Sequence, residues 1–113
     1  MLDENELMQQ VQSGKLEKLA VLFEQNHVAL FNYFLRSGNT HAVSEDLVQE
    51  TFMKILAYRS SFNGTSSFKS WMYGIGRNTC ADYYRKLKNA NQHVDIDDVE
   101  VSFEQTLDDQ FQQ

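Results

Sequence analysis

Cationic and aromatic side chains share one stripe of the segment 68–88, and together they suit the binding of nucleic acid. Read as a helix with about 100° per residue, the segment brings onto that stripe Tyr73, Arg77, Ala81, Tyr84 and Lys88, with Arg85 at its edge. Cations bind phosphates, and flat rings stack on bases that have left a duplex. The stripe therefore predicts a surface for single-stranded or partly opened nucleic acid.

The opposite stripe of the same segment has the character of a core-facing surface. Its members are Phe68, Met72, Ile75, Thr79 and Tyr83. Their spacing is typical of a helix packed on a hydrophobic core. A purely structural account of the cations also stays open at this point, because Arg85, Lys86 and Lys88 lie near a helix C-terminus and oppose its dipole favourably.

The total charge hides a strongly basic segment. The 113 residues carry a net charge of −6, which by itself argues against a DNA-binding protein. However, residues 59–91 hold six Lys or Arg and one Asp, whereas residues 92–113 hold seven acids and no Lys or Arg. Salt screens charges beyond about 8–10 Å, so a ligand responds to the local segment more than to the total.

Several classes of function lack the residues that they need. The single cysteine, Cys80, excludes a disulfide framework, so we expect an inert buried thiol in a reducing compartment. The three histidines have no carboxylate or thiol at ligand spacing, so neither a metal nor another cofactor is expected. No nucleophile–base grouping or glycine-rich phosphate loop supports a hydrolase, and we expect no enzyme. The acidic N-terminus and the lack of a long apolar run predict no membrane insertion.

The elements that must position these residues are predicted to be helices. The fold class is all-α, a small bundle of three main helices plus a short N-terminal helix, and no proline interrupts it. Asp3 and Glu6 form a capping-box pattern for the short helix, which ends near Val11. The main helices are expected at about 15–35, 40–58 and 67–89, the second capped by Asn39 or Thr40 and the third by Ser66 or Ser67.

A polar and acidic face is predicted on the helix that precedes the loop 59–67. Asp46, Gln49, Glu50 and Met53 follow each other at helical spacing, opposite a buried face that contains Leu47. Such a face is most often only solvated, but it also suits a basic partner helix.

Two linked motifs resemble region 2 of bacterial RNA polymerase sigma factors, most closely the extracytoplasmic-function (ECF) group. The family pattern is D-L-x-Q-E-x-F, a loop, and then F-x-x-W-x-x-x-I-x-R-N-x-x-x-D-x-x-R. In this chain the pattern is met by Asp46, Leu47, Gln49, Glu50 and Phe52, followed by Phe68, Trp71, Ile75, Arg77, Asn78, Asp82 and Arg85. The resemblance covers about residues 15–90, and the order and gap of the two motifs make it specific.

The resemblance implies a transcription initiation factor that binds core RNA polymerase and recognises and melts the promoter −10 element. The polymerase β′ clamp helices would dock on Asp46, Gln49, Glu50 and Met53. The non-template strand would contact the loop and the last helix, through Arg59, Asn63, Thr65, Ser67, Lys69, Tyr73, Arg77, Tyr84, Arg85 and Lys88. The family also implies a cytoplasmic bacterial protein and a possible anti-sigma factor as a further partner.

The resemblance has departures, and a rival reading stays open. Gly74 and Gly76 stand where ECF proteins commonly have a cation and an alanine, so one phosphate contact is missing, and the two glycines admit a close approach of another backbone. We expect residues 1–91 to form the region 2 domain and residues 92–113 to be an acidic linker or tail, either disordered or leading to an absent region 4 domain. The alternative is a helical protein-interaction module without nucleic-acid binding.

Overall fold

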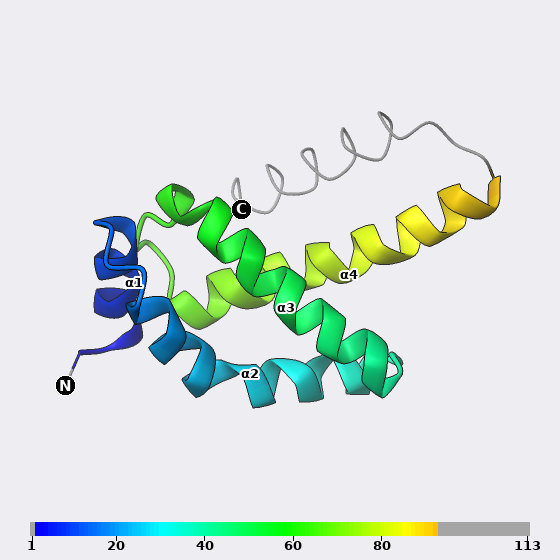
Figure 1. Ribbon diagram of the computed structural model, residues 1–113, viewed down its shortest axis with the longest axis horizontal. Coiled ribbons are helices and arrows are strands. Elements are labelled where there is room, and N and C mark those ends of the chain that lie inside the picture. Colours follow the sequence, from blue (N-terminus) through cyan, green and yellow to red (C-terminus); the bar gives the residue numbers. More distant parts are fainter. Residues whose placement is uncertain (1, 93–113) are drawn as a thin grey trace.

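The computed structural model describes residues 2–92, and these residues form helices joined by short turns. The elements are α1 (Glu4–Gln12), α2 (Lys18–Arg36), α3 (His41–Ala57), a 3₁₀ turn η1 (Arg59–Ser61) and α4 (Phe68–Gln92) (Figure 1). The predicted all-α class, with three main helices and a short first one, is confirmed. The predicted tail, residues 92–113, lies outside the described residues except for Gln92, which is the last residue of α4.

The three long helices pack on one another, and α1 closes one end of the bundle. α3 contacts both α2 and α4, whereas α1 contacts α2, η1 and the beginning of α4. Figure 1 shows α4 continuing past the other helices toward its C-terminal end. The first half of α4 is therefore largely a core element, while the second half exposes most of its side chains.

The caps that the sequence indicates are present at the helix N-termini. Asp3 and Glu6 form the predicted capping box of α1, with the Glu6 amide donating to Asp3 Oδ1 at 2.8 Å. Of the two candidates for α3, the cap is Thr40, whose hydroxyl accepts from the Val43 amide. Gly38, between α2 and α3, has a φ of 98°, a conformation that glycine adopts without steric strain.

The second helix differs from its prediction at its N-terminal end. It starts at Lys18 instead of Lys15, because the chain turns from Gly14 to Glu17 with short-range backbone hydrogen bonds. Leu16, an apolar residue within the predicted helix, lies in this turn and is 45% exposed. The buried stripe is carried instead by Leu22, Asn26, Leu30 and Phe34.

Gly76 permits close packing of α4 on α2. A Cβ atom there would lie 3.3 Å from the ring of Phe34 and 3.4 Å from the side chain of Leu30. The close approach at Gly76 is thus made by side chains of α2, whereas the sequence predicted another backbone. Any larger residue would push against a ring that is itself completely buried.

None of the helices within residues 2–92 has the length and apolar character that crossing a bilayer requires.

Candidate functional site

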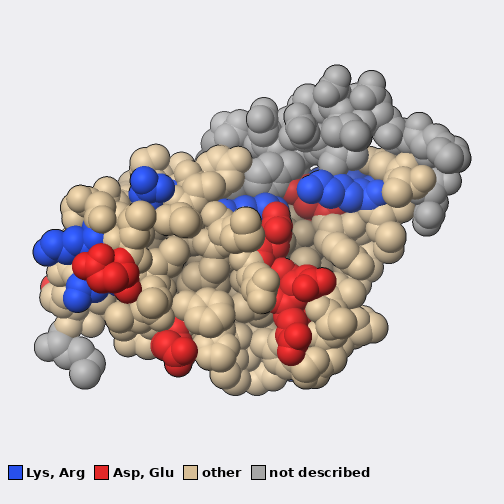
Figure 2. All heavy atoms as spheres, viewed as in Figure 1, with Lys and Arg blue, Asp and Glu red and all other residues tan. Residues whose placement is uncertain are grey.

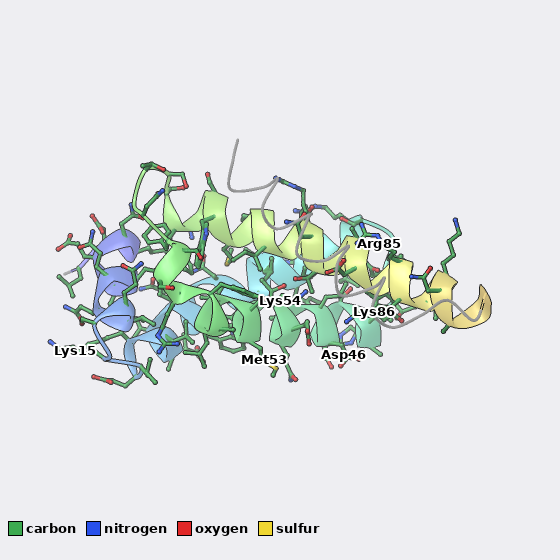
Figure 3. The ribbon with its side chains drawn as sticks, turned by 90° about the horizontal axis from the view of Figure 1, so that it is seen from above. Lys15, Asp46, Met53, Lys54, Arg85 and Lys86 are labelled. Carbon is green, nitrogen blue, oxygen red and sulfur yellow. The ribbon has the colours of Figure 1, made fainter. Side chains whose placement is uncertain are left out.

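The predicted acidic face lies on the outside of α3 and borders a groove. Asp46, Gln49 and Glu50 are exposed, and Met53 is 67% exposed, which is unusual for a large apolar side chain. All four line a groove of about 380 Å³ between α3 and α4. Acidic side chains gather in one band on the face seen in Figure 2, next to basic side chains of α4. In Figure 3, Asp46 and Met53 lie along the outer edge of α3.

A buried ion cluster joins α3 to α4 at the floor of this groove. The Asp82 carboxylate, 3% exposed, is paired through Oδ1 with Arg85 on its own helix, and its Oδ2 lies 3.9 Å from Lys54 Nζ on α3. Lys54 also donates to the Thr79 hydroxyl at 3.3 Å. Figure 3 shows Lys54 lying between the two helices. The sequence placed Asp82 beside the basic stripe, whereas the fold turns it inward.

Burial dominates the titration of both members of this interhelical pair. Desolvation raises the pKa of Asp82 above its ordinary value, although Lys54 and Arg85 act in the opposite direction. Desolvation likewise lowers the pKa of Lys54, against the attraction of Asp82 and Glu50. Each charge is therefore stabilised by its partners by less than burial destabilises it.

The predicted basic stripe of α4 is exposed over its C-terminal part. Arg77 and Lys88 are exposed, and neither forms an ion pair with a residue in the range 2–92. Tyr84, between them in sequence, is 46% exposed. Arg85 is only partly available, because its guanidinium is held by Asp82. Among residues 2–92, this stripe thus keeps two cations without an ion pair and one exposed aromatic side chain.

Tyr73 belongs to the packing of the bundle more than to the exposed stripe. Its side chain is half-buried, and its ring meets that of Tyr33 edge to face with centroids 5.3 Å apart. Edge-to-face pairs of this kind stabilise a core. Tyr73 is therefore the member of the predicted stripe with the least free ring surface.

The loop residues predicted to contact a base lie together between α3 and α4, but most have partners of their own. Asn63 Oδ1 accepts from both the amide and the hydroxyl of Thr65, which closes a tight turn. Ser67 Oγ accepts from the Ser70 amide and so caps α4. Asn63, Thr65 and Ser67 are nevertheless exposed. Arg59 donates to the last turn of α3 through the Leu56 carbonyl at 2.8 Å.

Lys69 stands apart from the other predicted DNA-binding residues. Its ammonium lies 3.1 Å from Glu4 Oε1 and donates to Asn26 Oδ1 at 2.7 Å. These contacts join α4 to α1 and α2. Lys69 is still about half exposed, so a phosphate would compete with Glu4 for it.

Sequence reasoning missed the polar side chains that fix the loops. Asn5 on α1 accepts from the Phe68 amide at 2.8 Å, and so adds a second cap to the beginning of α4. Gln12 donates to the carbonyls of Arg59 and Phe62 and anchors η1. Asn39 lies buried between α2 and α4. The sequence marked Asn39 only as a possible cap of α3 and gave no sign of Asn5 or Gln12, because their partners, like Cys80 and Tyr84 for Asn39, lie at least 41 positions away.

Cys80, predicted to be a buried thiol, is only partly buried, with its Sγ 3.7 Å from Asn39 Nδ2. Within the described part of the chain, no three His, Cys, Asp or Glu side chains come together in a way that could hold a metal ion.

Comparison with known proteins decides the family. The profile of the Sigma-70 region 2 family matches residues 22–90, which include α3, the loop and nearly all of α4. The chain belongs to the sigma-70 region 2 family. The match contains both motifs of the sequence analysis, so the predicted family is confirmed.

The similar proteins are named as RNA polymerase sigma factors, and several of the names specify the ECF group. The chain is 29% identical over 98 residues to "ECF RNA polymerase sigma factor SigX" of Bacillus subtilis, which covers 83% of this chain and 50% of that protein. It is 33% identical over 103 residues to "ECF RNA polymerase sigma-E factor" of Salmonella typhimurium, and this match covers 88% of this chain and 52% of that protein. The chain thus spans about half the length of these relatives. No solved structure matches the chain significantly.

Proposed function

We propose that this domain is the polymerase-binding and −10-element-binding part of an ECF-type sigma factor, which acts in transcription initiation and not as an enzyme. The observation that carries the proposal is that two neighbouring helices carry exposed surfaces of opposite charge. The acidic face of α3 and the basic stripe of α4 belong to helices that pack directly on each other. A factor that holds the enzyme with one helix and promoter DNA with the next requires this arrangement.

The acidic face is the proposed docking site for the β′ clamp helices of core RNA polymerase. Gln49 and Glu50 offer a hydrogen-bonding and a charged group, and Met53 offers an apolar contact of the kind found at the centre of interfaces. Their exposure leaves all three accessible.

The basic stripe and the loop are the proposed site for the opened non-template strand. Arg77 and Lys88 would contact phosphates, and these contacts position the strand without reading its sequence. The exposed polar groups of Asn63, Thr65 and Ser67 would meet an extruded base, whose edge a closed duplex hides. Stacking returns about 1–3 kcal/mol per base against an unstacking cost of a few kcal/mol, so melting needs no nucleotide hydrolysis.

Binding to core polymerase tests the first half of the proposal. The double variant Gln49→Ala, Glu50→Arg should abolish binding measured by fluorescence anisotropy of the labelled chain. The control is Gln25→Ala, Glu24→Arg, which makes the same two exchanges at exposed positions of α2 and should bind normally. Equal binding by both variants would contradict the assignment of the α3 face.

Binding to single-stranded DNA, in the presence of core polymerase, tests the second half. Arg77→Ala with Lys88→Ala should weaken binding to strands selected from a randomised pool and reduce the salt slope by about 1.4, since each phosphate contact contributes roughly 0.7. The matched control removes one Arg and one Lys elsewhere, at the exposed Arg36 and Lys15. An interaction module without nucleic-acid binding would show no strand preference and no difference between the variants.

A further inference from the structure

Tyr84 is an exposed aromatic ring whose hydroxyl is anchored inside the protein. The ring is 46% exposed, yet its hydroxyl donates a hydrogen bond to Oδ1 of Asn39, which is itself 7% exposed. The ring also meets that of Tyr83 edge to face, with centroids 5.1 Å apart. A side chain held at its tip and along its edge cannot turn freely, so its remaining surface has a fixed orientation.

The anchor, Asn39, is rigid for reasons that lie in the turn between α2 and α3. Its side-chain Nδ2 donates to the Phe34 carbonyl at 2.8 Å, and its backbone amide donates to the same oxygen at 3.3 Å. With Nδ2 donating to that carbonyl, the side-chain amide is oriented with Oδ1 toward the Tyr84 hydroxyl. The turn thus fixes the acceptor, and the acceptor fixes the ring.

Two cations of α4 that form no ion pair within residues 2–92, Arg77 and Lys88, lie on the same side of the helix as Tyr84. Arg77 precedes Tyr84 by seven residues and Lys88 follows by four, so all three lie within about 40° around the helix axis. Both cations are exposed, as is the small Ala81 one turn before the ring. Small neighbours leave the ring surface open, and flanking cations suit the phosphates on either side of a base.

We propose that Asn39 is a positioning residue that holds Tyr84 as a preset stacking platform for one unpaired base of a single strand bound along Arg77 and Lys88. This rests on the proposed DNA-binding function and deepens it, since it names the ring that takes the base and the residue that fixes the ring. Presetting the ring removes part of the ordering cost of binding. It also makes the hydroxyl, which touches no base, a determinant of affinity.

The experiment is an abasic scan of a selected single strand bound to the complex of the chain with core polymerase. In the wild-type complex, one abasic position should weaken binding by roughly 5- to 150-fold, the range for loss of one stacked base. Tyr84→Leu should bind the intact strand more weakly by the same factor, and the abasic substitution should then have no further effect on its binding. Tyr83→Leu removes a ring from the same turn, beside the α3–α4 groove, but leaves the bond of Tyr84 to Asn39, so the abasic effect should stay at the same position.

Two variants separate positioning from stability. Tyr84→Phe keeps the ring and loses the anchor, so it should retain the abasic effect at the same position but bind the intact strand several-fold more weakly. Asn39→Asp keeps an acceptor for the Tyr84 hydroxyl, so it should bind the strand more tightly than Asn39→Ala. Thermal unfolding of both variants shows whether this difference in affinity follows their stability. A 2-aminopurine at the platform position should be quenched by the wild type and less by Tyr84→Phe.

The outcomes distinguish this inference from the function on which it rests. If the wild type binds no single strand, the proposed function itself fails. If strands bind with the dependence on Arg77 and Lys88 but no abasic position depends on Tyr84, only the platform is refuted. If Tyr84→Phe matches the wild type in affinity and quenching, Asn39 has no positioning role.

Discussion

Removing the carboxylate charge of Asp82 should destabilise the fold more than removing its interhelical partner. The Lys54 side chain is 12% exposed, and in Asp82→Asn its charge faces a neutral amide that cannot compensate it. Breaking a buried pair from one side costs about 3–5 kcal/mol. We expect the low end, about 3 kcal/mol, because Lys54 keeps its bond to Thr79 and because the amide is spared the desolvation that raises the pKa of the carboxylate. In a domain of this size, that lowers Tm by roughly 15 °C.

The reverse variant should be milder, and this asymmetry is the core of the prediction. In Lys54→Met the carboxylate still pairs with Arg85, and the methionine fills much of the lysine stem's volume without a charge to desolvate. The expected cost is about 1 kcal/mol. The double variant should cost about 2 kcal/mol, less than the sum of the two, because it leaves no buried lysine charge uncompensated.

The pH dependence gives an independent check with a defined sign. Since burial raises the pKa of Asp82 above 3.8, the folded chain holds a proton that the unfolded chain has lost, so the unfolding free energy falls as pH rises through this window. Since burial lowers the pKa of Lys54 below 10.5, the unfolding free energy rises with pH between the folded-state pKa and 10.5. Asp82→Asn should lose the first slope, and Lys54→Met the second.

Urea unfolding followed by circular dichroism measures all four free energies of the cycle. The matched control is Glu45→Gln, the same kind of acid-to-amide exchange in an exposed pair with His41, and it should change stability by less than about 0.5 kcal/mol. Costs that add within about 0.5 kcal/mol, or a larger loss in Lys54→Met than in Asp82→Asn, would refute the reasoning.

Substitutions at three further positions test the packing and the loops. Gly76→Leu should cost about 3 kcal/mol in urea unfolding by overpacking against Phe34, whereas Gly76→Ala should stay within about 1 kcal/mol of wild type because helix propensity offsets the tight contact; equal effects would contradict the packing account. Asn5→Ala removes an acceptor from the Phe68 amide and should lower stability by about 1 kcal/mol, with Asn5→Asp as the control that keeps it. Gln12→Ala should speed amide hydrogen exchange in the turn after α3 with little change elsewhere. Unchanged exchange rates in that turn would show that Gln12 does not stabilise it.

Local sequence rules predicted the helices and the exposed surfaces well. The Asp3 capping box, the Thr40 cap and the buried spacing of Phe68, Met72 and Ile75 depend on residues within one or two turns of each other. Such interactions repeat at fixed offsets, so a linear sequence shows them. The predicted start of α2 was wrong because the residues after Gly14 form a turn, although they fit the helical period equally well.

The sequence by itself determined that this chain forms helices, which of their faces are charged, and that it carries the two sigma region 2 motifs. Tertiary structure decided which members of each face are free. It turned Asp82 inward onto Lys54, seated Tyr73 against Tyr33, and tied the Tyr84 hydroxyl to Asn39. The physical reason is that helical period fixes only the angle of a side chain around its own axis, whereas burial and hydrogen bonding depend on which other helix lies opposite.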